Sequence, residues 1–429
     1  MNALVLAATL AALPPPLAEY LKAARAHDHA LGVSRAQIDE QEAAVDAALA
    51  ALLPTFQANA YYQRNEYSAV FDLSRLPPGL ALFGDVKTLA VQPYNQVGGG
   101  AGVLVPLLDA QRLYARREAA RGRAAAWQAE RATEAEVLLA TARAYWQVVA
   151  GQGIEEAAER ALATARESLG VSRAMLASGT STRLAVDRAR VDVDRAGEQI
   201  ASAREALGLS RRNLETLSGE PVNGPLPEPG ESALPSGPEE AYRAEAEHDR
   251  PEVGEAREAL ARAEDALGAA WARLAPSLAG SARESYTNAP GFLPSDWFWT
   301  AGVNLSWNLD PVGTTAAVRQ ARAAVTESRE RLAQTLDQVR DDVHAAWLAV
   351  EADHARMEAA SAESASAREA LSLTQTQLKS GTVTSLDVSQ ANRDAFQADA
   401  TLSQSRADLA AALLALEQAA GRPLLQDSP

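Results

Sequence analysis

The chain contains two copies of one unit, and this duplication restricts its fold more than any other feature of the sequence. Residues 176–222 align without gaps to residues 378–424 at a constant offset, and each stretch opens on a glycine-centred break, LASGTSTRLAV and LKSGTVTSLDV. Residues 218–238, rich in proline and glycine, lie between the copies and are typical of a linker. The sequence therefore predicts two structural repeats, residues 19–217 and 239–421.

Each repeat is expected to hold the same elements in the same order. An opening helix, at about 17–52 and about 239–274, precedes two strands, a very long helix, a tight turn and a closing helix. Residues 70–93 are an insertion in the first repeat that joins its two strands, and they have no counterpart in the second repeat. The predicted ranges are strands 54–66 and 94–106, long helix 110–178, turn 178–183 and closing helix 184–217 in the first repeat, and strands 275–287 and 297–309, long helix 311–379, turn 380–384 and closing helix 385–420 in the second, with a tail at 422–429.

The predicted long helices carry a seven-residue apolar repeat. In the second repeat one heptad phase holds Leu336, Val343, Val350, Met357, Ser364, Leu371 and Leu378, of which only Ser364 is polar. Sustained heptads predict coiled-coil packing. The helix expected at 311–379 would be roughly 100 Å long, and opening and closing helices of about 36 residues each would together match that length. Two half-length helices are therefore expected beside each long one.

Around Trp297 the period changes from seven to two. One side of this strand holds Trp297, Trp299, Ala301, Val303, Leu305, Trp307 and Leu309, and the other side is mostly small and polar. The alternation suits either a half-buried sheet in a soluble α+β protein or a lipid-facing barrel strand. Trp299 and Trp307 would lie roughly 26 Å apart along an extended strand, close to the height of the apolar band between aromatic girdles. We predict that Trp297, Trp299 and Trp307 form a lipid-facing girdle.

Four strands are too few to close a barrel in a membrane, and lipid does not tolerate an open sheet edge. Two chains would supply eight strands, whose interior fills with side chains, whereas three would supply twelve and leave a lumen. The predicted fold class is thus mainly α with a small β part: duplicated long-helix hairpins, plus four strands per chain in a shared trimeric transmembrane β-barrel.

Composition and motifs exclude several functions. The formal charge of −16 argues against nucleic-acid binding, and the lack of cysteine excludes disulfides, thiol catalysis and a lipid-modified cysteine. The run VGGGAG at 97–102 leads into a strand, so we interpret it as small residues packed close to a neighbouring chain and not as a nucleotide loop. We expect no catalytic site, cofactor or metal. Residues 1–18 resemble a signal peptide, the alternative being an apolar helix start.

Several segments resemble the TolC family of outer-membrane efflux proteins. They are the strand entries LLPTFQA and RLAPSLAG, the exits GVLVPLLDAQR and GVNLSWNLDPVG, the twin SGT turns and HDRPEV at 248–253. The resemblance covers about 17–424, and its most specific part is the duplicated order. It implies a trimer with a twelve-stranded barrel in the outer-membrane lipid and a twelve-helix tunnel across the periplasm. A periplasmic adaptor would dock at the helical turns and link the channel to an inner-membrane pump of the RND, ABC or MFS type.

The resemblance also implies roles for individual residues. The adaptor-contact turns would be Gly179–Leu184 in the first repeat and Gly381–Leu386 in the second. Their contact residues would be Gly179, Thr180, Ser181, Thr182, Gly381, Thr382, Val383 and Thr384. Leu378 and Asp387 would lie at a periplasmic constriction, where three Asp387 carboxylates could attract cations. The Thr384–Asp387 spacing equally fits a capping box. Ala185, Leu378 and Val383 replace the acidic, tyrosine and arginine residues common at the family's gate, so closure would rest on apolar packing.

The sequence therefore predicts an outer-membrane channel subunit of a tripartite efflux or type I secretion system, a passive conduit and not an enzyme. Two alternatives stay open. A periplasmic adaptor also has long helical hairpins, but it would have one hairpin and separate small β domains. The second alternative is a coiled-coil scaffold outside any membrane, which the helices alone do not exclude. The exported substrate is not encoded in any recognisable motif.

Overall fold

The computed structural model describes residues 14–72, 88–230, 234–291, 293 and 295–425. Most of the predicted signal segment and residues 73–87 of the first-repeat insertion lie outside this range. Residues up to 38, 125–257 and from 331 onward form one compact unit, and residues 39–124 and 258–330 form a second. The elements are α1 (Pro15–His27), α2 (His29–Ala50), β1 (Thr55–Arg64), β2 (Ala69–Asp72), β3 (Thr88–Gln92), β4 (Asn95–Leu108), α3 (Ala110–Ala177), α4 (Arg183–Ser218), α5 (Glu239–Asp249), α6 (Pro251–Ala272), β5 (Ser277–Thr287), β6 (Trp297–Ser306), α7 (Pro311–Ser380) and α8 (Ser385–Ala419).

The opening helix of each repeat is interrupted, whereas the sequence predicted one continuous helix. The breaks fall at Asp28 (φ −63°, ψ 131°) and Arg250 (φ −65°, ψ 130°), both extended. At Arg250 the cause is Pro251, because proline disfavours helical geometry in the residue before it. At Asp28 the side-chain carboxylate accepts a hydrogen bond from the Ala30 N–H at 2.7 Å and so caps α2. Each break begins a new helix with its own direction.

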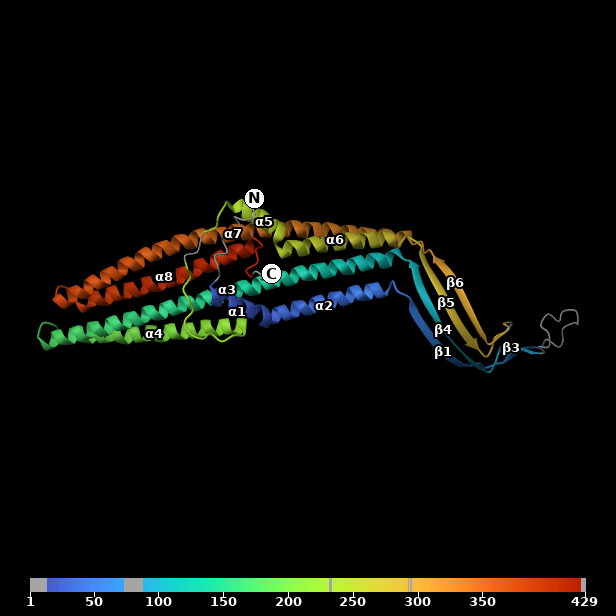
Figure 1. The fold of residues 1–429 in the computed structure, drawn as a ribbon, viewed down its shortest axis with the longest axis horizontal. Coiled ribbons are helices and arrows are strands. Elements are labelled where there is room, and N and C mark those ends of the chain that lie inside the picture. The colour runs from blue at the N-terminus through green and yellow to red at the C-terminus, as the bar shows by residue number, and fades with distance from the viewer. Residues whose placement is uncertain (1–13, 73–87, 231–233, 292, 294, 426–429) are drawn as a thin grey trace. The chain divides into compact units, whose positions relative to one another are not determined.

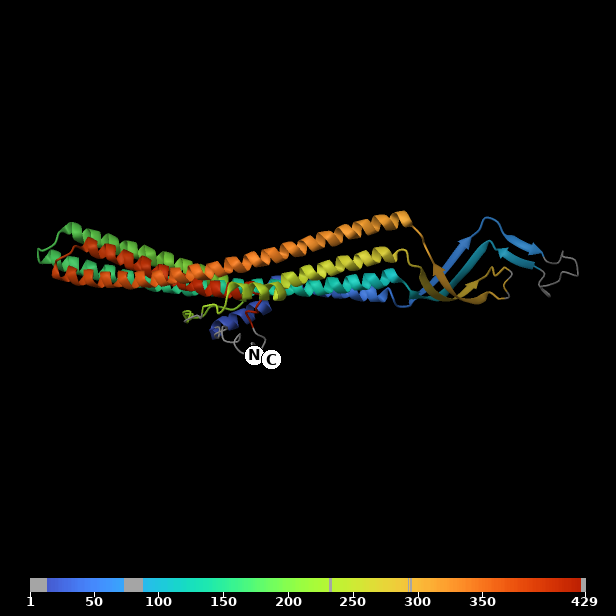
Figure 2. The same cartoon turned by 90° about the horizontal axis from the view of Figure 1, so that it is seen from above.

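The first unit is built from two helical hairpins, α3 with α4 and α7 with α8, which Figures 1 and 2 show in green and in orange to red. The heptad positions Val343 and Val350 are buried in a cluster with Tyr242, Val253 and Leu416. A second cluster holds Tyr145, Val148, Leu207 and Leu214, together with Leu17 of the predicted signal segment. The predicted coiled-coil seams are thus the packed seams of this unit.

The second unit is built on an antiparallel sheet with strand order β1-β4-β5-β6. In this unit α3 and α6 are joined by ion pairs, Arg121 to Glu258 at 3.1 Å and Arg262 to Glu118 at 3.2 Å. Two further strands, β2 and β3, lie in the insertion of the first repeat and pair only with each other. Strand β6 ends at Ser306, so Trp307 lies just beyond it, where its indole Nε1–H donates to the Leu274 carbonyl at 3.0 Å.

The glycine run of β4 serves neighbouring strands of the same chain, and our interpretation that it packs against a neighbouring chain is wrong. Strand β4 is paired on both sides, with β1 and β5. A Cβ atom at Gly98 would lie 2.6 Å from the Tyr61 ring, and one at Gly100 would lie 2.5 Å from the Glu284 carbonyl oxygen and 3.2 Å from the Arg283 Nε. The glycines therefore leave room for side chains that cross over β4.

Among the described residues, no helix is both long enough and apolar enough to cross a membrane.

Replacing a core leucine tests the packing of the first unit. Leu416 of α8 is fully buried, and Leu416→Ala is expected to lower the free energy of unfolding by about 2–5 kcal/mol because it leaves a cavity. Urea unfolding of the purified protein in detergent measures the loss. Leu209→Ala, at an exposed position of α4, is the control and should change stability by less than about 0.5 kcal/mol. Equal losses would contradict the assigned core.

Candidate functional site

The two helical turns have the same hydrogen bonds at corresponding residues. Gly179 and Gly381 both have φ of 77°, which suits glycine because it lacks a Cβ. The Thr180 N–H donates to the Met175 carbonyl at 2.9 Å, and the Thr382 N–H donates to the Gln377 carbonyl at 3.0 Å. The Gly179 and Gly381 N–H groups donate to the carbonyls three residues earlier, at 3.1 and 3.0 Å, and together these bonds form the Schellman ending of a helix. Both turns close by the same mechanism.

A threonine then starts each closing helix. The Thr182 hydroxyl accepts from the Ala185 N–H at 3.3 Å, and the Thr384 hydroxyl accepts from the Asp387 N–H at 3.4 Å. In the second turn the contact is reciprocal: the Asp387 carboxylate accepts a hydrogen bond from the Thr384 N–H at 2.7 Å. These hydrogen bonds from the Thr384 hydroxyl and N–H hold the pKa of Asp387 below its usual value. The capping box is therefore formed, and Asp387 is a carboxylate at neutral pH.

The predicted docking residues lie together at the surface. The glycines and threonines of both turns are exposed, and Ser181 and Val383 are partly exposed. Next to them, Leu184 and Leu386 are 58% and 51% exposed at equivalent positions of α4 and α8. Both leucines end the adaptor-contact turns that the family resemblance implied, Gly179–Leu184 and Gly381–Leu386. Of the two predicted constriction residues, Asp387 is exposed, whereas Leu378 of α7 is buried.

The four-stranded sheet has one apolar and one polar face. Cross-strand neighbours share a face, so the register places Phe56, Val103, Ala282 and Ala301 in one row, and Ala58, Ala101, Glu284 and Trp299 in the next row of the same face. Phe56 is 85% and Trp299 77% exposed. The opposite face carries Gln57, Asn59, Ser281, Arg283, Thr300 and Asn304. A large exposed apolar surface of this kind needs a nonaqueous partner.

The aromatic residues predicted as a girdle fall into two groups. Trp297 and Trp299 lie in β6 near the end where β5 finishes, and the Tyr286 ring contacts Trp297 at a centroid distance of 5.1 Å with a tilt of 44°. Trp307 lies past the opposite end of β6. Glu284 is the one carboxylate of the four strands on the apolar face, and it pairs across strands with Trp299.

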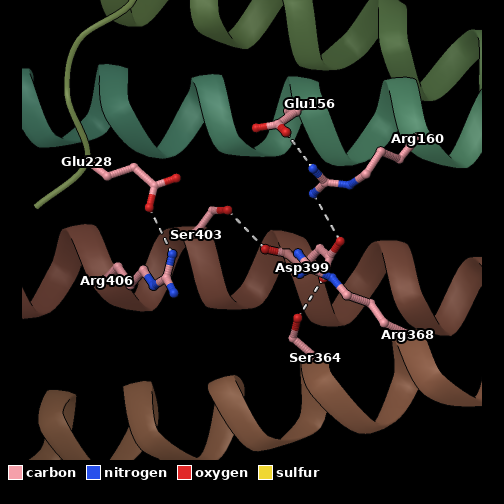
Figure 3. Close-up of polar contacts among 8 residues, drawn as sticks. All are labelled: Glu156, Arg160, Glu228, Ser364, Arg368, Asp399, Ser403 and Arg406. Atoms are coloured by element: carbon pink, nitrogen blue, oxygen red, sulfur yellow. Dashed lines mark hydrogen bonds and ion pairs between the residues drawn. The ribbon is translucent and has the colours of Figure 1, made fainter.

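A buried carboxylate joins three helices of the first unit (Figure 3). Asp399 of α8 has a side chain 7% exposed and accepts hydrogen bonds from Arg368 (2.7 Å) and Ser364 (2.6 Å) of α7 and from Arg160 (3.0 Å) of α3. Burial by itself would raise the pKa of Asp399, but the hydrogen bonds and positive charge of the arginines and Ser364 outweigh it and lower the pKa. The carboxylate therefore stays charged and ties both hairpins together.

Sequence reasoning missed this cluster. Its one visible signal was Ser364, the only polar member of the α7 heptad phase. A small hydroxyl at a seam position indicates a polar partner on the facing helix, and that partner is Asp399. Elsewhere in the part of the chain that the structure describes, no three His, Asp or Glu side chains are placed to hold a metal ion.

Two long coiled-coil hairpins and an amphipathic sheet with open edges define the class of outer-membrane channel proteins. The family model described as "Outer membrane efflux protein" matches residues 20–220 and 243–422. The chain therefore belongs to the outer membrane efflux protein family. A comparison with curated proteins found no match.

Solved structures of such channels share the fold. CusC superposes with a TM-score of 0.80 at 19% identity, covering 95% of this chain and 92% of that one. The open-state MtrE channel of Neisseria gonorrhoeae superposes with a TM-score of 0.78 at 21% identity, covering 95% of this chain and 89% of that one. The CmeC channel of Campylobacter jejuni superposes with a TM-score of 0.76 at 17% identity, covering 95% of this chain and 86% of that one.

Family and fold together confirm the main expectations from the sequence. The protein is an outer-membrane efflux channel of the TolC-like fold that extends into the periplasm, and it is not an enzyme. The adaptor and scaffold alternatives are set aside.

Removing the charge of Asp399 tests whether it holds the hairpins together. Asp399→Asn is expected to lower the free energy of unfolding at pH 7 by about 1–3 kcal/mol, since hydrogen bonds to a charged group are lost. Because the folded pKa lies below the usual value of 3.8, the wild-type advantage is complete above that pH and disappears as the pH falls through the lowered pKa. Urea unfolding at pH 7 and near pH 3 measures both effects.

The control is Asp394→Asn, an exposed carboxylate on the same helix that accepts only from Gln390. Its effect should stay below about 0.5 kcal/mol. If Asp399→Asn lowers the free energy of unfolding no more than Asp394→Asn does, or by the same amount near pH 3 as at pH 7, then the Asp399 charge does not hold the hairpins together.

Proposed function

We propose that three copies of the chain form a passive conduit across the outer membrane and periplasm, driven by a partner pump. The observation that carries this proposal is the sheet, whose apolar face is exposed and whose outer strands β1 and β6 lack a second neighbour in the chain. Unpaired backbone groups are too costly in lipid, so strands from other copies must complete the wall. Proteins of this family form trimers, and twelve strands leave a lumen.

The helices support the same assembly through a second seam on α7. Its first seam packs against α8, but a further stripe with heptad spacing is exposed in the single chain. It consists of Ala345, Leu348, Ala352, Ala355, Ala359, Ala362, Ser366 and Leu373. Small residues at such spacing allow a neighbouring helix to approach closely. We assign this stripe to the contact between copies.

In the assembled trimer the apolar face of the sheet would meet lipid. Trp297 and Trp299 would lie at one membrane interface and Trp307 toward the other, because tryptophan favours these interfaces. The polar face would then line the lumen.

The two turns are proposed as docking sites for a periplasmic adaptor, which would connect the channel to an inner-membrane pump of the RND, ABC or MFS type. Exposed Leu184 and Leu386 supply apolar contacts beside the small, hydroxyl-rich turns. Three Asp387 carboxylates at the starts of the α8 helices would attract cations to that end. Asp387 can act there while it caps α8, because it is exposed.

A charge on the apolar face tests the membrane assignment. Val303 of β6 lies on that face and Thr300 on the polar one. Wild-type protein is expected in the outer-membrane fraction as a heat-modifiable trimer in mild detergent. Val303→Lys should lose most of this trimer, because a lysine near the bilayer midplane costs about 2–4 kcal/mol per strand. The control Thr300→Lys should assemble normally. A soluble wild-type monomer, or equal loss in both variants, would disprove the assignment.

Docking at the turns is tested with Leu184→Glu and Leu386→Glu, singly and together. Each places a charge where an apolar contact is proposed, so the double variant should lose most drug export in a strain that depends on this channel. Trimer assembly should be unchanged, since neither side chain packs in the core. Minimum inhibitory concentrations and trimer yield measure the two properties. Full export by the double variant would refute docking at these positions.

A further inference from the structure

The polar face of the sheet carries a single charge. Its side chains are amides, hydroxyls, glycines and a few apolar groups, and among the residues of β1, β4, β5 and β6, all within the described chain, Arg283 is the only charged one on this face. The adjacent Glu284 belongs to the opposite face, because successive side chains of a strand alternate. No carboxylate of these strands therefore neutralises Arg283 from its own side.

The guanidinium of Arg283 lies along the wall of the sheet. It starts on β5 and crosses β4 at its glycines, where a Cβ at Gly100 would come within 3.2 Å of both Nε and Nη2. On the far side Nη2 donates to the Asn59 side-chain oxygen of β1. Nε donates to the Ser285 hydroxyl at 3.1 Å. Glycine positions thus make the space, and two side chains fix the orientation.

Both partners of the guanidinium are neutral. An amide oxygen and a hydroxyl accept hydrogen bonds without cancelling the charge, unlike the carboxylates that pair with Arg160, Arg204 and Arg422. Arg283 is also exposed. Its remaining N–H groups can meet a phosphate, carboxylate or sulfate, the anions that an arginine fork binds best.

We propose that the Arg283 residues of three copies form a ring of positive charge on the lumen wall, a weak binding site for anionic groups of the cargo that passes. This inference rests on the proposed trimeric conduit. The chain as a whole carries a charge of −16, so a locally positive ring would hold anionic cargo, or anionic groups of zwitterionic cargo, at the membrane level. The site would favour such groups without closing the channel, because each guanidinium is held flat against the wall.

Pyrophosphate block of single channels tests the ring. Wild-type trimers in planar bilayers should show block by pyrophosphate added on the extracellular side, deeper when the voltage drives anions inward. Arg283→Gln should weaken this block at least about fivefold, the factor expected for losing one close charge interaction in water. Arg283→Lys keeps the charge and should retain most of the block. Glu284→Gln, a change at the next residue but on the other face, should leave it unaltered.

A second variant keeps the proposal testable if Arg283→Gln does not assemble. Asn59→Asp alters the partner by one atom and places a carboxylate against the guanidinium, so it should weaken the block to a similar extent. Absence of wild-type block, or block unchanged in Arg283→Gln or Asn59→Asp, would overturn the ring while leaving the conduit intact. Failure to observe any wild-type channel would instead refute the conduit and, with it, the ring.

Discussion

The structure depends on the hydrogen-bonding capacity of two strand edges. In the sheet β1-β4-β5-β6, the inner strands are paired on both sides and the outer strands on one. Water could satisfy the remaining N–H and C=O groups, but the exposed apolar face makes water an unfavourable solvent for this surface. A chain that must hide both an apolar face and two edges is incomplete by itself. In the proposed assembly a closed wall pairs the two edges, and lipid covers the apolar face.

The helices also leave apolar positions exposed in the single chain, and these positions follow a seven-residue spacing. Coiled-coil seams bury apolar side chains within each hairpin, yet α7 has apolar positions on two sides, and only one side is used in the single chain. Between the hairpins the contact is partly ionic, through Asp399 of α8 and Arg160 of α3. Such a contact adds geometric definition that alanine-rich seams lack, because small side chains slide past one another more easily than hydrogen-bonded groups do.

Much of this was predictable because it repeats or is periodic. The duplication, the heptads around Val343, the alternation after Trp297 and the glycine turns are all local patterns. What could not be predicted depends on partners distant in the chain. Asp399 meets Arg160 across 239 residues, and Gly100 is needed for the side chain of Arg283 on another strand. The break at Arg250 was signalled by Pro251, whereas the break at Asp28 depends on a side-chain cap that the sequence alone does not distinguish from an ordinary helical aspartate.

The hydroxyls of the two turns have a consequence for association kinetics. Thr180 and Thr382 bond to the carbonyls of Met175 and Gln377 with both their N–H and their hydroxyl groups, and Ser178 and Ser380 reinforce the same acceptors. Every turn is therefore rigid before any partner arrives. A preorganised surface loses little conformational entropy on complex formation. In the proposed docking, an encounter with an adaptor would therefore need no folding step of the turns.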